Sequence, residues 1–107
     1  MVTIQDFQKL DIRACTILKV EDHPAADKLY VLQIDFGDEQ RQIVAGIKNS
    51  YTKEELVNKQ IFVIKNLEPA VIRGVESNGM LMAVEDENKK AFVLVSDKKV
   101  DNNCKVY

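Results

Sequence analysis

Side chains that could support catalysis or bind a metal ion are few in this chain and lie far apart. His23 is the only histidine, and it precedes Pro24 in a polar stretch, which favours a loop-shaping role over a catalytic triad. Cys15 and Cys104 stand near opposite ends without a CxxC pair, so neither a zinc site nor a disulfide framework is indicated. Acidic pairs such as Glu54-Glu55 fall where a helix or a turn is expected. The sequence therefore predicts no enzyme, no metal site and no cofactor.

A binding role is favoured instead, and the ten residues "GVESNGMLMA" (74–83) pose the clearest question. A polar patch, Glu76-Ser77-Asn78, stands between two glycines and is followed by two methionines. One interpretation is a surface that holds a ligand. The other is a turn into a core strand, with Met80 and Met82 sharing an inward face because side chains alternate along a strand.

Basic residues are spread along the chain rather than clustered. The formal net charge is −2 and the pI is about 5.4, which weakens a nucleic-acid interpretation, although a local patch matters more than the total charge. Arg13 and Lys19 are expected on the outward face of a strand. Further basic residues fall at strand or loop ends: Lys28, Arg41, Lys48, Lys65 and Arg73. Only 7% of residues are aromatic and none is tryptophan, so a bound nucleic acid would be recognised by shape and backbone rather than by base stacking.

Length and composition predict one soluble domain spanning residues 1–107. The chain is 46% hydrophobic, which suffices to bury a core and argues against disorder. No charged-then-apolar leader stands at the N-terminus, and no apolar run approaches membrane-spanning length. We therefore expect a cytoplasmic protein with no membrane partner. A domain this small buries a modest share of its surface, which is compatible with an oligomer.

Two capping patterns predict short helices. Thr3 is followed three residues later by Asp6, and Thr52 is followed three residues later by Glu55. In such a pair the hydroxyl and the acidic side chain each accept a hydrogen bond from a free backbone N–H at the helix start. The apolar stripe of the first helix would consist of Ile4, Phe7 and Leu10.

Elsewhere the apolar residues recur at every second position, as in half-buried strands. In the first strand we expect one set of residues to face inward: Ile12, Ala14, Thr16, Leu18 and Val20. The alternate set would face mostly outward: Arg13, Cys15, Ile17, Lys19 and Glu21. Pro24 ends this strand. Further strands are predicted over residues 30–36, 41–47, 60–66, 79–86 and 91–96, with a loop containing an extended piece over 67–74.

This order predicts an all-β protein: an OB-fold five-stranded barrel with short helices at the N-terminus and between strands 3 and 4. Several short strands separated by turn signals are typical of a small closed barrel. A single helix between the third and fourth strands is the layout of an OB-fold. A β sandwich is the alternative, but it would normally lack that helix.

Three segments carry a resemblance to a known family: "KLDIRACTILKVEDHPAADKLYVLQIDFGDEQRQIVAGI", "EELVNKQIFVIKNLEP" and "GVESNGMLMA". Together they resemble the tRNA-binding domain. That domain occurs in free-standing CsaA-like dimeric tRNA-binding proteins and as a C-terminal appendage of many methionyl-tRNA synthetases. The resemblance covers nearly the whole chain in unbroken order. It implies an OB-fold that recognises tRNA by shape rather than by anticodon.

The resemblance also implies which residues contact tRNA. Ser77 would offer its hydroxyl to phosphate or ribose, Asn78 would donate and accept hydrogen bonds, and Met80 would make an adaptable apolar contact. Gly79 would let the backbone come close to the ligand. The implied phosphate-binding residues are Lys28, Arg41 and Arg73, with Asn66 as a hydrogen-bonding partner.

Free-standing members of about this length resemble homodimers, which implies an interface at the chain ends. The apolar residues expected there are Ile4, Phe7, Val106 and Tyr107; the alternative is that they merely cap the ends of the barrel. The chain departs from the family around "NLEPAVIRG", where related proteins often carry more basic residues and only Arg73 is basic here. Fewer phosphate contacts would lower the affinity for tRNA and flatten its salt dependence.

Three functions follow as hypotheses. The first is structure-specific, largely sequence-independent tRNA binding, either alone or beside a synthetase. The second is a CsaA-like chaperone that binds unfolded peptide for export. The third is a dimerisation module of methionyl-tRNA synthetase. Salt-sensitive binding to tRNA favours the first, and saturable binding of unfolded polypeptide without tRNA favours the second.

Overall fold

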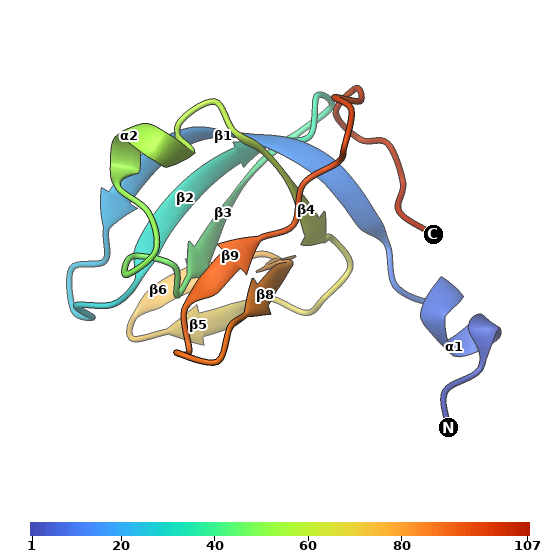
Figure 1. Ribbon diagram of the computed structural model, residues 1–107, viewed down its shortest axis with the longest axis horizontal. Coiled ribbons are helices and arrows are strands. Elements are labelled where there is room, and N and C mark those ends of the chain that lie inside the picture. The colour runs from blue at the N-terminus through green and yellow to red at the C-terminus, as the bar shows by residue number, and fades with distance from the viewer.

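A curled five-stranded antiparallel sheet forms the centre of the molecule in the computed structural model, which describes residues 1–107 (Figure 1). The strand order is β3-β2-β1-β4-β7. The strands are β1 (Ile12–Asp22), β2 (Tyr30–Asp35), β3 (Gln40–Ala45), β4 (Gln60–Ile64) and β7 (Met80–Leu81). The two outer strands, β3 and β7, contact each other across the curl. The result is an OB-like half-barrel, as predicted.

Both predicted helices are present and both begin with a complete capping box. α1 (Ile4–Gln8) is capped by Thr3 with Asp6, and α2 (Lys53–Leu56) by Thr52 with Glu55. α2 covers one end of the barrel and buries Leu56, whereas α1 stands to one side and buries nothing (Figure 1). Neither helix has the length and apolar character needed to cross a membrane.

The prediction of which β1 side chains point into the core is wrong along the centre of the strand. Cys15 and Ile17 are buried in the core, whereas Leu18, expected to face inward, is exposed. A bulge between Ile17 and Lys19 shifts the pairing with β2, so the alternation changes phase there. The following residue Val20 returns to the core.

The C-terminal tail pairs with the edge of the first half of β1 that β2 does not reach. The backbone N–H of Ala14 donates to the carbonyl of Cys104 (2.9 Å), and that of Val106 donates to the carbonyl of Ile12 (2.9 Å). Ile12 and Ala14 are buried as predicted, although neither belongs to the main core cluster.

The last third of the chain forms two hairpins. One joins parts of the two strands predicted on either side of the charged turn, and the other includes the segment predicted as a loop with an extended piece. β5 (Ala70–Ile72) pairs with β6 (Val75–Ser77), and β8 (Ala83–Glu85) pairs with β9 (Ala91–Val93). The predicted strand over 79–86 divides at Met82, whose N–H donates to Phe62 of β4 (3.0 Å) while its carbonyl accepts from Leu94 (3.1 Å). The chain thus changes pairing partner at this residue.

His23 holds the loop after β1 against the β5–β6 hairpin. Its Nδ1 accepts from the N–H of Ala25 (2.9 Å), and its Nε2 lies 2.9 Å from the carbonyl of Ile72. With Nδ1 accepting, the proton resides on Nε2, which donates to Ile72. The predicted loop-shaping role is confirmed, and the buried imidazole is used structurally.

Candidate nucleic-acid interface

An open hollow of about 610 Å³ lies where the β2–β3 turn meets the segment that follows β4. We call it the basic hollow, and it is lined by Glu39, Gln40, Arg41, Gln42, Lys65, Asn66, Leu67, Glu68, Pro69 and Asn78. Three of the predicted tRNA-binding residues, Arg41, Asn66 and Asn78, are brought together here. They come from β3, from the end of β4 and from the turn after β6.

Arg41 is fixed in the basic hollow by its surroundings. Its Nη1 donates to the carbonyl of Lys65 (2.6 Å) and its Nη2 to Oε1 of Glu39 (3.0 Å). The guanidinium carbon also lies 5.7 Å from the centre of the Phe36 ring. A guanidinium held in this way is pre-oriented for an anionic ligand.

Lys65 is a second cation of this site, which the sequence placed among the basic residues at strand or loop ends but not among the implied tRNA contacts. Its side chain is only 13% exposed, and its Nζ lies 4.6 Å from the centre of the Phe36 ring. Nζ also lies 3.1 Å from Oε1 of Glu39 and 3.7 Å from Asp38. Hydrogen bonds from Arg41, and then from Lys65, hold the pKa of the Glu39 carboxyl below its usual range.

Asn66 connects the basic hollow to the N-terminal segment. Its Oδ1 accepts from the N–H of Asp11 (2.8 Å), and its Nδ2 donates to the carbonyl of Lys9 (2.7 Å). The side chain remains exposed, but its principal hydrogen bonds are made within the protein. It fixes the entry into β1 beside the site.

Ser77 is 4% exposed and lies beneath the surface. Its Oγ accepts from the N–H of Val44 (3.0 Å) and donates to the carbonyl of Gly79 (3.2 Å). The hydroxyl therefore attaches β6 to the edge strand β3. This gives Ser77 a positioning role, and a direct contact with tRNA stays a prediction.

Asn78 and Met80, in the stretch 74–83, do reach the surface. Asn78 donates from Nδ2 to Oε1 of Glu76 (3.0 Å), while its backbone N–H donates to the carbonyl of Gln42 (2.8 Å). Met80 is 52% exposed, and Met82 is partly buried. The exposure of Met80 favours the surface interpretation of this stretch over core packing.

Lys28 and Arg73 lie outside the basic hollow, on adjacent loops that the hydrogen bond between His23 and Ile72 holds together. Both side chains are exposed and neither forms an ion pair. A shallower hollow of about 400 Å³ shares Gln42 with the basic hollow and extends to Gly74, beside Arg73. The predicted cations thus stand at the two ends of one continuous surface.

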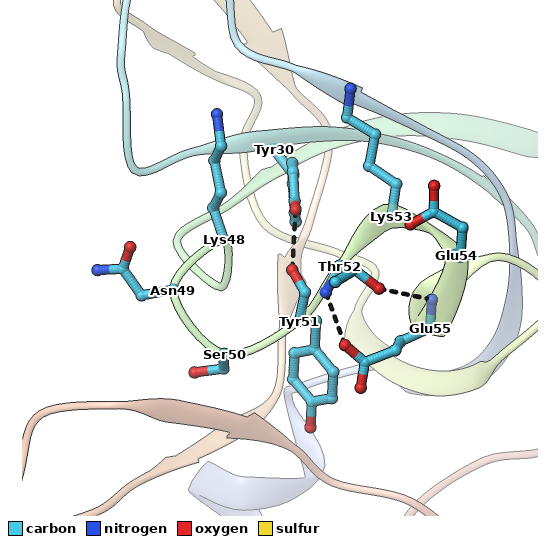
Figure 2. A pocket seen from close by; sticks show the side chains of 9 residues that line it. All are labelled: Tyr30, Lys48, Asn49, Ser50, Tyr51, Thr52, Lys53, Glu54 and Glu55. Carbon is cyan, nitrogen blue, oxygen red and sulfur yellow. Dashed lines mark hydrogen bonds between the residues drawn. The ribbon is translucent and has the colours of Figure 1, made fainter.

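A further hollow of about 520 Å³ opens where α2 begins (Figure 2). Lys48 and Lys53 line it, and each pairs with Asp22 (3.0 and 3.1 Å). Hydrogen bonds from these two lysines hold the pKa of the Asp22 carboxyl below its usual range. Tyr30 closes the base by donating from its hydroxyl to the carbonyl of Tyr51 (2.8 Å). The two lysines thus share Asp22, as Arg41 and Lys65 share Glu39 in the basic hollow.

Replacing Ser77 by alanine tests the positioning role. The change leaves the buried N–H of Val44 without its acceptor, so Ser77→Ala is expected to lower the free energy of unfolding by about 1–3 kcal/mol. Denaturant titration measures this. Ser50→Ala is the matched control, because the buried Oγ of Ser50 has no partner to lose. Equal stability of the two variants would contradict the positioning role.

Comparison with known proteins decides the family. A family model described as "Putative tRNA binding domain" matches residues 12–104. The chain belongs to the tRNA-binding domain family. The methionine–tRNA ligase of Pyrococcus horikoshii is 50% identical over 105 residues, which are 98% of this chain and 14% of that enzyme. The chain therefore spans about one seventh of the length of the curated relatives that it matches.

Solved structures of tRNA-binding domain relatives share the whole fold. A methionyl-tRNA-synthetase-related protein from Pyrococcus horikoshii superposes with a TM-score of 0.92 at 33% identity, covering 100% of this chain and 98% of that one. The CsaA chaperone protein of Picrophilus torridus gives a TM-score of 0.92 at 33% identity, covering 100% of both chains. Both relatives are themselves about as long as this chain.

Proposed function

We propose that this chain binds tRNA by its shape and phosphate backbone, over the surface that runs from the basic hollow to Lys28 and Arg73. The arrangement that carries the proposal is the placement of Arg41 and Lys65 side by side in an open hollow. Acidic residues line the middle of the surface: Glu21, Asp22 and Glu76. Phosphates would therefore be held at the two ends of this surface. Such an arrangement suits recognition of the spacing between tRNA phosphates rather than of the base sequence.

The salt dependence of binding tests how many phosphates are held. Four cations are assigned: Lys28, Arg41, Lys65 and Arg73. Each phosphate contact releases counterions, so log K against log salt concentration should fall with a slope of roughly −3, at about −0.7 to −0.9 per contact. Fluorescence anisotropy of labelled tRNA at several salt concentrations gives the slope. A slope near zero would contradict a phosphate-based interface.

The proposed role is binding without catalysis, in association with a methionyl-tRNA synthetase. The matched family is a binding family, and the ligase relatives extend far beyond the segment matched here. Such a chain would raise the local concentration of tRNA for a partner synthetase, in the cytoplasm where charging takes place. Its own side chains would orient tRNA and leave the chemistry to that enzyme.

We also propose a homodimer through the chain ends. Phe7 is 37% exposed, and Ile4 and Tyr107 project further into solvent. Val106 lines an apolar hollow of about 310 Å³ together with Phe62, Met82, Leu94 and Val95. Burial of such aliphatic and aromatic surface between two copies would stabilise both.

Replacing Phe7 by aspartate tests the homodimer. A charge at this position could not be buried between copies without a partner, so Phe7→Asp is expected to shift the mass from dimer to monomer in sedimentation analysis. Val57→Asp is the control, because Val57 is 38% exposed and lies beside α2. A wild-type monomer, or a dimer unchanged by Phe7→Asp, would contradict the interface.

A further inference from the structure

One carboxylate oxygen lies between the two cations of the basic hollow. Oε1 of Glu39 is 3.0 Å from Nη2 of Arg41 and 3.1 Å from Nζ of Lys65. Asp38 adds a second carboxylate 3.7 Å from the same ammonium. A non-bridging phosphate oxygen is also a negatively charged acceptor of hydrogen bonds from a guanidinium and an ammonium group.

The two cations are held in place without Glu39. Arg41 also donates to the carbonyl of Lys65, and Lys65 also donates to Oδ1 of Asn103 (3.3 Å) while lying over the Phe36 ring. The cationic position would therefore persist if the carboxylate moved away.

Glu39 itself is held less firmly. It stands at the exposed turn between β2 and β3, and 41% of its side chain is accessible to solvent. Rotation of this side chain into water would free Arg41 and leave Lys65 with only the longer carboxylate contact, to Asp38 (3.7 Å). An anionic ligand could then take the position of the carboxylate oxygen.

We propose that Glu39 occupies an anion-binding position between Arg41 and Lys65 that a nucleic-acid phosphodiester takes by displacing it. The Glu39 carboxylate competes with any polyanion for Arg41 and Lys65, and so weakens polyanion binding at this end of the surface. Removing its charge strengthens binding. The identity of the ligand as tRNA rests on the proposed function. The existence of an anion-binding position between Arg41 and Lys65 does not depend on that function.

The test compares Glu39→Gln with wild type on two probes, tRNA and inorganic pyrophosphate. Glu87→Gln is the matched control, because Glu87 lies in the exposed β8–β9 turn, forms no ion pair and gives the same change in net charge. Glu39→Gln is expected to bind both probes roughly 3- to 10-fold more tightly than wild type, as loss of a competing ion pair predicts. Glu87→Gln should change neither by more than about twofold, as expected for a distant, screened charge.

The outcomes separate the two claims. Equal pyrophosphate affinity in Glu39→Gln and Glu87→Gln would overturn the anion-binding position, whatever tRNA does. A gain on pyrophosphate with no tRNA binding by any variant would support the position and overturn the tRNA function. A gain on both probes, confined to Glu39→Gln, supports both. Thermal unfolding of each variant checks that the barrel is intact.

Discussion

Reversing the charge of Lys28 and Arg73 together is expected to weaken tRNA binding roughly 100-fold. Each side chain is exposed and free of ion pairs, so its charge is available to phosphate. Loss of one charge-assisted contact costs about 1.5 kcal/mol or more, which is about tenfold in affinity. The loss should be uniform among tRNA species, because phosphate contacts carry no sequence information. Anisotropy titration with two unrelated tRNAs measures both quantities.

The matched control reverses Lys89 and Lys90 in the β8–β9 turn. That pair gives the same change in net charge and is likewise exposed and unpaired. Arg73 and Lys89 also share a positive φ (51° and 63°), so backbone strain is matched. If Lys89→Glu with Lys90→Glu weakens binding as much, total charge rather than the assigned surface explains the loss, and the placement of the interface is wrong.

Replacing Gly79 by alanine is expected to lower the free energy of unfolding by about 2–5 kcal/mol, a large share of the roughly 5–15 kcal/mol of an ordinary domain. The added Cβ would lie 2.8 Å from Cγ1 of Val63 and 3.0 Å from the carbonyl oxygen of Ile64, and its φ of +130° is strained for any L side chain. Both neighbours belong to β4, the strand that pairs with β7. Urea unfolding gives the change directly.

Gly74→Ala shows how much of the stability loss in Gly79→Ala comes from backbone strain alone, without steric crowding of the added Cβ. Gly74 also has a positive φ (+87°), but an added Cβ there meets nothing within 4 Å. This variant should lose only about 1 kcal/mol, the ordinary cost of a side chain in that conformation. If Gly79→Ala and Gly74→Ala unfold at the same urea concentration, Gly79 is not needed for close packing against β4.

The features that the sequence predicts well are local ones. Each capping box depends on two residues three apart, so Thr3 with Asp6 and Thr52 with Glu55 could be recognised without knowing the fold. The loop role of His23 followed in the same way from its neighbour Pro24. The order of strands and the single helix between the third and fourth then indicated the barrel.

The features that the sequence missed depend on contacts between distant segments. The bulge near Ile17 lies in the pairing of β1 with β2, just beyond the residues that pair with β4. Lys65 lines the basic hollow beside Arg41 because the β2–β3 turn lies against the end of β4. Gly79 was expected to approach a ligand, yet its backbone lies against β4 of its own barrel. No local pattern carries such information.

Binding of purified protein to total tRNA and to duplex DNA of similar length, each at low and moderate salt, distinguishes recognition of tRNA from general attraction to polyanions. We expect binding to tRNA that weakens as salt rises, with markedly weaker binding to duplex DNA, since shape as well as charge is recognised. Equal affinity for the two nucleic acids, or no binding to tRNA at low salt, would contradict the proposed recognition of tRNA.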